Sequence, residues 1–242
     1  MNKHINLLIK AVIFTLPIII CLYTQNVFAE AKREIEIKVI RQAENEIISE
    51  ASVNHRSQFL LTTVSEGVMI TAPKYNQQTI DDMVILMEAL GLYGARLLPE
   101  GHPAAIPHEL REYAQNKFIQ SLDYLDQIGH YPELYILSGV KFINLEGKSE
   151  QFFVQTSLLA GGTSLFSTDY TSQSLKLMGN LMRAMGWKQV ALFPVTQHPR
   201  VPAHLSQELM LMFEESHISV EHQPNSLRTI LVSPDYLSAQ GI

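Results

Sequence analysis

The chain matches itself at a constant offset of 95 residues, so that residues 75–138 align without a gap on residues 170–233. Shared amphipathic patterning explains matched apolar positions, but it does not explain matched glycines and prolines, which mark backbone turns. We therefore interpret the sequence as a tandem duplication. The paired positions are Tyr75/Tyr170, Gln78/Gln173, Met83/Met178, Leu86/Leu181, Met87/Met182, Ala89/Ala184, Gly91/Gly186, Leu97/Leu192, Pro99/Pro194, Pro107/Pro202, Leu110/Leu205, Phe118/Phe213, Ser121/Ser216 and Ser138/Ser233.

The first 29 residues are typical of a secretory signal peptide. Lys3 and Lys10 form a basic start, an apolar run follows, and residues 27–29 supply a small-residue cleavage site. The run is shorter than the roughly 20 residues of a membrane-spanning helix, and Pro17 interrupts it. We expect a periplasmic protein with no integral membrane span after cleavage; an uncleaved inner-membrane anchor facing the periplasm is the alternative.

Cleavage would remove Cys21, the single cysteine, so the mature chain would depend on a packed core and not on disulfides. It would also lower Lys+Arg from 18 to 16 against 24 Asp+Glu, and the formal net charge from -6 to -8. An acidic chain of this kind lacks the clustered cations that bind phosphate groups. Nucleic acid is therefore not an expected partner.

The charge pattern divides the chain into four regions. Residues 1–29 are the signal peptide, and residues 30–56 are so rich in charge that we favour a helical or flexible linker, with a short strand as the alternative for its opening. Residues 57–145 form the first α/β repeat and residues 146–242 the second.

Each repeat begins with two short strands around a glycine turn: Gln58–Thr63 and Val68–Ala72 in the first, Gln151–Ser157 and Thr163–Ser167 in the second. A helix follows in each copy. Thr79 and Asp82 predict a capping pair at its start in the first copy, and Gly91 and Gly186 predict its end.

Apolar runs at 95–98 and 190–193 predict buried parallel strands. A second helix is expected from Pro107 or Pro202, and a last strand at 134–137 or 229–232. The expected fold is thus α/β, with two tandem βαβαβ-type repeats that each carry an extra N-terminal strand. One continuous sheet and two small domains both remain open.

Ligands of open α/β sheets bind beyond the carboxyl ends of the parallel strands. The strand-exit loops there each contain a His-Pro pair and a second histidine six residues later. Three roles compete for these histidines: structural hydrogen bonds in the loops, polar contacts to a small molecule, and metal ligation, for which Zn or Cu would be suitable. The candidate ligand-binding residues are Tyr75, Gln78, His102, His108, Tyr170, Gln173, His198 and His204.

No phosphate-binding glycine loop, serine-hydrolase elbow or mature thiol is present in the sequence, so we predict no catalytic residue and no cofactor. We expect a non-catalytic interaction or assembly component of the bacterial cell envelope, with other envelope proteins as partners and strand addition as one way of assembly. The alternative is a small-ligand or metal-binding protein that uses the paired His-Pro loops; a hydrolase at the same place is the third reading.

Overall fold

The computed structural model describes residues 33–92, 96–127, 135–157, 162–167, 169–191, 201–221 and 229–232. The predicted signal peptide lies outside these residues. The elements are β1 Arg33–Gln42, β2 Glu46–Val53, β3 Ser57–Val64, β4 Gly67–Thr71, α2 Gln77–Ala89, α3 His108–Gln127, β5 Tyr135–Ile143, β6 Ser149–Ser157, β7 Gly162–Ser167, α4 Ser172–Ala184, β8 Gln189–Ala191, the 3-10 turn η1 Ala203–Leu205, α5 Ser206–Glu215, β9 Ser219–Glu221 and β10 Thr229–Val232.

The described strands form one sheet in the order β4-β3-β2-β1-β5-β6-β7-β10-β8-β9. The α/β class is therefore confirmed, and the strands belong to one continuous sheet. Strands β1 to β4 are joined as antiparallel neighbours, as are β5 to β7. Parallel pairing joins β1 to β5 and also joins β7, β10, β8 and β9. The boundary expected between residues 145 and 146 falls in the turn of the β5–β6 hairpin.

The predicted linker is wrong in its secondary structure, because its described part from Arg33 to Val53 forms β1 and β2. Ile35, Ile37 and Val39 are buried on one face of β1. A helix would spread residues two apart around its circumference, whereas a strand places them on one side. The charged side chains that favoured a linker lie between these residues, on the open face of the sheet. β1 is consequently a central strand of the sheet, between β2 and β5, and not a linker.

Both predicted hairpins are present as β3–β4 and β6–β7, and each leads into a 13-residue helix. The start of α2 differs from the prediction: the N-cap is Asn76, whose Oδ1 accepts a hydrogen bond from Thr79 N at 2.8 Å. Thr79 and Asp82 are buried inside the helix. The capping prediction failed because an Asx residue one turn earlier caps equally well.

The ends of α2 and α4 agree with the glycine prediction. Gly91 has φ 65° and Gly186 has φ 72°, the left-handed conformation that glycine adopts without steric cost. The residue after each glycine donates a backbone hydrogen bond back into the helix, from Leu92 N to Met87 O and from Trp187 N to Met182 O, both at 2.9 Å. All of these positions are 95 residues apart.

The strands after the first helix of each unit differ between the two halves. β8 includes Val190 and Ala191 of the predicted second-copy strand, whereas Arg96–Leu98 of the first copy are not in a strand. The predicted last strand at 229–232 is confirmed as β10. Its first-copy counterpart is not a separate strand, because Tyr135–Leu137 are the first residues of β5.

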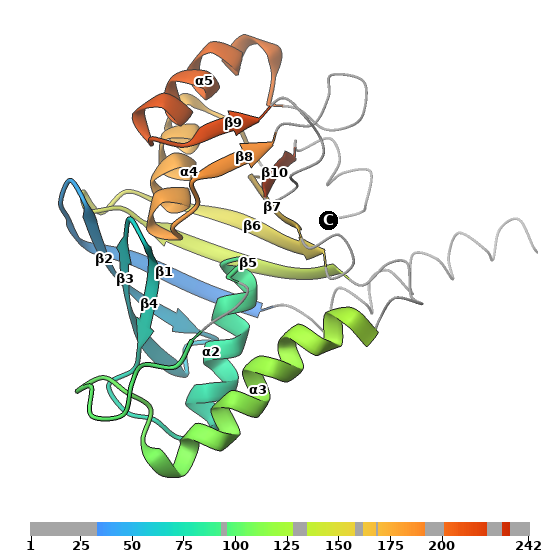
Figure 1. Ribbon diagram of the computed structural model, residues 1–242. Helices are drawn as coiled ribbons and strands as arrows, with labels where there is room; N and C mark the ends of the chain where they lie inside the picture. The colour runs from blue at the N-terminus through green and yellow to red at the C-terminus, as the bar shows by residue number, and fades with distance from the viewer. Residues whose placement is uncertain are drawn as a thin grey trace, which may run out of the picture.

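The core lies between one face of the sheet and the helices. In the view of Figure 1, α2 and α3 lie in the lower half of the picture, and α4 and α5 lie in the upper half. α2 contacts strands on both sides of β1, including β3 and β6, and α4 contacts β2 and β6. Two hydrogen bonds join the halves: the buried Thr63 Oγ1 donates to Ala184 O at 2.7 Å, and the part-buried Trp187 Nε1 donates to Leu90 O at 2.8 Å. The two units therefore share one core.

Candidate functional site

A cavity of about 480 Å³ lies beside β4, within the 300–1,000 Å³ that is usual for binding pockets. β4 pairs with β3 along one edge; within the described part of the chain its other edge has no strand neighbour and faces this cavity. The lining residues are Glu66, Gly67, Val68, Met69, Ile70, Tyr75, Met83, Met87, Leu92, Arg96, Leu97, Leu98, Ala104, Ile106 and Phe118. They come from β4 and the turn before it, the loop between β4 and α2, both helices of the first half and the segment that joins these helices.

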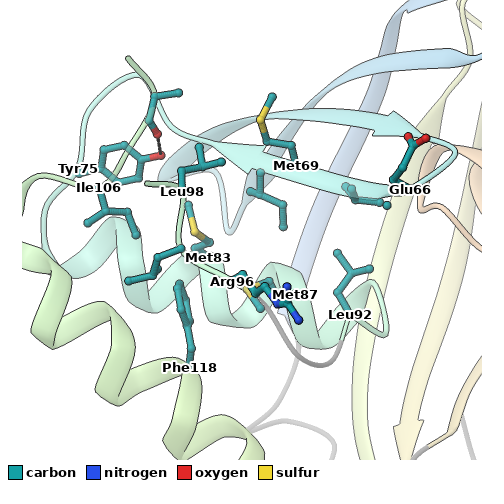
Figure 2. A pocket seen from close by; sticks show the side chains of 15 residues that line it. Glu66, Met69, Tyr75, Met83, Met87, Leu92, Arg96, Leu98, Ile106 and Phe118 are labelled. Carbon is teal, nitrogen blue, oxygen red and sulfur yellow. Dashed lines mark hydrogen bonds between the residues drawn. The ribbon is translucent and has the colours of Figure 1, made fainter. Parts of the chain in front are cut away.

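The floor of the cavity is apolar. Figure 2 shows Met83 and Met87 from α2 and Phe118 from α3 on the helix side, opposite the strand that carries Met69. Met83 and Phe118 belong to the buried core, with exposed fractions of 4% and 8%. Flexible methionine side chains adapt to differently shaped apolar partners. The floor therefore favours an aliphatic occupant.

Tyr75 closes one end of the cavity. Its hydroxyl accepts a hydrogen bond from Ala72 N at 3.2 Å, just after β4, and donates one to Ala104 O at 3.1 Å, as the dashed line in Figure 2 marks. Burial raises the pKa of this phenol above its ordinary value, so the hydroxyl keeps the proton that it donates to Ala104. Tyr75 thus fastens the 96–106 segment to the end of β4.

The charged lining residues are Glu66 and Arg96. The Ser65 hydroxyl and backbone hydrogen bonding lower the pKa of the Glu66 carboxyl, which stays ionised. Arg96 is an exposed residue. Because both charges are at solvent-accessible positions, the apolar floor governs the chemistry of the cavity.

The free edge of β4 carries backbone donors. Val64 and Gly67 flank a two-residue turn and oppose each other, so they form the hydrogen-bonded pair that closes the hairpin. Hydrogen-bonded and non-hydrogen-bonded pairs alternate along an antiparallel ladder. The N–H and C=O groups of Val68 and Ile70 consequently point away from β3, along the edge that lines the cavity.

Of the predicted site residues that the structure describes, Tyr75 alone lines this cavity. Gln78 Nε2 instead donates to Asp82 Oδ1 at 3.2 Å. His102 Nδ1 accepts from Ala104 N at 3.1 Å, and His108 Nδ1 lies 3.2 Å from Glu100 Oε1 with 87% of its side chain exposed. These contacts are local, as the structural reading of the histidines expects.

The second-half residues do not form a common site with them in the described structure. Tyr170 is 6% exposed, and burial raises the pKa of its phenol, while Gln173 and His204 are exposed. His198 lies outside the described residues. No group of three or more His, Cys, Asp or Glu side chains that could hold a metal occurs among the residues with a described position.

Asp82 is a buried carboxylate that the sequence reasoning placed at a cap. It accepts hydrogen bonds from Ser57 Oγ at 2.7 Å and from Arg56 Nη2 at 2.9 Å, in addition to Gln78. Its side chain is 0% exposed. The network ties the start of β3 to α2, and the position 95 residues later is the buried apolar Leu177. Asp82 thus has a structural role in the first half.

The sequence reasoning missed the edge of β4 and its opposite wall, Arg96–Leu98. The available signal was the unequal continuation of the last strands, since 134–137 are followed by the apolar residues Val140, Phe142 and Ile143, whereas 229–232 are followed by Ser233, Pro234 and Asp235. A nine-residue β5 indicates that this segment belongs to the following hairpin.

No helix in the described ranges is both long and apolar enough to cross a bilayer. A scan against protein-family models, a search of curated proteins and a search of solved structures each gave no match to this chain.

Proposed function

We propose that this protein is an exported, periplasmic interaction component of the bacterial cell envelope, without catalytic activity, that binds another envelope protein along the free edge of β4. The single observation that carries the proposal is the open, hydrogen-bonding strand edge beside an apolar cavity. Strand edges that are neither covered nor blocked by charge are where other chains add to a sheet.

The proposal includes an internal duplication of the α/β unit. It is supported by α2 and α4, which start and end 95 residues apart and have caps at matching positions. It is also supported by Gly67 and Gly162, which begin β4 and β7 at the same offset. Matched amphipathic helices alone would not require identical caps and turns.

A photo-crosslinking amino acid at Met69 tests the proposal in cells that express the protein. Met69 is 37% exposed on β4, and we expect a covalent adduct with one envelope protein, identified by mass spectrometry. The matched control is the same amino acid at Leu145, 55% exposed in the β5–β6 turn, which should give no such adduct. Equal adducts at both positions, or none at Met69, would refute the proposal. Fractionation of the same cells tests the periplasmic location.

A small apolar ligand is the second candidate, because the cavity volume and its methionine-lined floor also suit one. Native mass spectrometry of the purified chain separates the two. A bound small molecule that is lost on replacing Met83 and Met87 with larger side chains would favour the ligand. Elemental analysis of the same sample tests for the Zn or Cu that the paired His-Pro loops could hold.

A further inference from the structure

The second half of the molecule shows how the edge of its hairpin is covered. β10 lies between β7 and β8 and runs parallel to both. Its residues pair in register with β7: Ile230 with Ser164, Leu231 with Leu165 and Val232 with Phe166. The chain thus supplies its own strand, Thr-Ile-Leu-Val, to the edge of β7.

The first half lacks this strand among its described residues. At the 95-residue offset, β4 corresponds to residues 162–166 of β7, and Arg96–Leu98 correspond to residues 191–193, which begin at the end of β8. Both β4 and Arg96–Leu98 line the cavity. The cavity therefore occupies the place in the first half that β10 takes in the second.

The first-half counterpart of β10 is used elsewhere in the sheet. Tyr135–Leu137 are the first residues of β5, where they pair with Ser157, Thr156 and Gln155 of β6. Nothing in the described chain fills the gap beside β4.

We propose that the cavity is an acceptor slot for one strand, and that its occupant is an extended segment of a partner protein that runs parallel to β4 and carries aliphatic or β-branched residues. This inference rests on the proposed function and specifies how the partner protein would bind to β4. The backbone groups of Val68 and Ile70 would form the ladder with the partner strand. Side chains on one face of that strand would pack on Met83, Met87 and Phe118, which selects for apolar residues at alternate positions.

A synthetic peptide with the sequence of residues 228–233, Arg-Thr-Ile-Leu-Val-Ser, is the probe for this slot. We expect the fluorescently labelled peptide to bind the purified full chain with saturation. A peptide with Lys in place of Leu, or with an N-methyl group on the Val amide, should bind at least about tenfold more weakly, because the first loses apolar contact and the second loses the N–H that would donate to Ile70 O in a parallel ladder.

The matched protein variants are Ile70→Pro and Ile70→Val. Proline removes the outward N–H without breaking a hydrogen bond to β3, so the fold is retained while the ladder is lost. We expect at least about tenfold weaker peptide binding for Ile70→Pro and a change of less than about threefold for Ile70→Val. If Ile70→Pro does not fold, amide hydrogen exchange of the unaltered chain replaces it: saturating peptide should slow exchange at Val68 and Ile70.

Disulfide mapping tests the parallel direction. In a chain with Cys21→Ser, the only native cysteine is removed, and Met69→Cys or Thr71→Cys places one thiol on β4. Met69 and Thr71 correspond to Ser164 and Phe166, whose partners are Ile230 and Val232. Met69→Cys should therefore crosslink to a peptide with Cys in place of Ile, and Thr71→Cys to one with Cys in place of Val. The reverse preference would overturn the parallel slot.

The outcomes separate this inference from the proposed function. Envelope adducts at Met69 without peptide binding would leave the function intact and refute the strand slot. Peptide binding without any envelope adduct would support the slot and refute the envelope role. A chain that self-associates through β4, with the association lost in Ile70→Pro, would also overturn the inference, because the occupant would then be a second copy.

Discussion

The two halves of the molecule build the same hairpin and helix and then diverge at the sheet edge. In the first half, β4 leads through Tyr75 into α2; in the second, β7 leads through Tyr170 into α4. β10 pairs with the edge of β7, whereas the edge of β4 borders a cavity. One strand edge is thus paired in one half and open in the other, and in our proposal the open edge is the one that binds a partner, because exposed edges otherwise promote unwanted association.

The helix pairs provide the sharpest contrast in packing. Gly179 lies on α4 where a Cβ would approach Met212 Sδ to 2.7 Å and also contact Ser216 Oγ, whereas α2 has Val84 at the matching position. Gly179→Val should therefore lower the free energy of unfolding by about 3 kcal/mol through overpacking. Denaturant unfolding monitored by circular dichroism measures it.

The reciprocal variant Val84→Gly is the control. It should cost about 1 kcal/mol, from the lower helix propensity of glycine together with the lost packing of the partly buried Val84 side chain. Equal losses for Gly179→Val and Val84→Gly would contradict the tight contact between Gly179 and Met212.

The two helix-ending glycines differ in their surroundings. Alanine at Gly91 would cost about 1 kcal/mol of unfolding free energy for the left-handed backbone. Gly186→Ala should cost about 2 kcal/mol, because its Cβ would also lie 2.7 Å from Val68 Cγ2, across the interface between the halves. Thermal melting of both variants checks the order; a larger loss for Gly91→Ala would show that the contact between Gly186 and β4 is absent.

The buried carboxylate of the first half can be replaced by its second-half counterpart. Asp82→Leu should lower the free energy of unfolding by about 1.5 kcal/mol, because the buried Ser57 hydroxyl loses its acceptor. Adding Ser57→Ala should recover part of the loss, as chemical denaturation of both variants would show. An additive double variant would mean that the 2.7 Å contact does not contribute.

The two tyrosines predict a smaller, pH-dependent difference. Burial raises the folded-state pKa of both phenols above the ordinary value of 10, and the shift is larger for Tyr170. Below about pH 10 the stabilisation is complete; above it the unfolded chain ionises first, so stability falls with rising pH. Tyr170→Phe should remove more of this alkaline loss than Tyr75→Phe when unfolding is measured at about pH 8 and about pH 11. The reverse order would contradict the deeper burial of Tyr170.

Local signals in the sequence predicted the two hairpins and the helix that follows each of them. The glycines at the helix ends and the turns of the hairpins depend on backbone conformations that few other residues adopt, so their positions could be inferred. β1 and β2 could not be inferred in the same way, because strands with one open face carry charges there. The apolar residues Ile35, Ile37 and Val39 alternate as in a strand, but the charged residues between them favoured a linker.

The candidate site was less predictable, because it depends on which strand pairs with which. Rules for α/β sheets directed attention to the strand-exit loops, where Tyr75 indeed closes the cavity but His102 and His108 make only local contacts. Whether Tyr135–Leu137 end the first unit or begin the second is decided by long-range pairing with β6. The open edge beside β4 follows from that choice.

Amide hydrogen exchange along β4 and β7, measured residue by residue in the partner-free protein, tests the difference between the halves most directly. We predict alternating protection in β4, with fast exchange at Val68 and Ile70 and slow exchange at Met69 and Thr71, because only the latter donate to β3. In β7 we predict slow exchange at consecutive residues, since β6 and β10 pair with both edges. Slow exchange at Val68 and Ile70 without any partner would contradict the open slot.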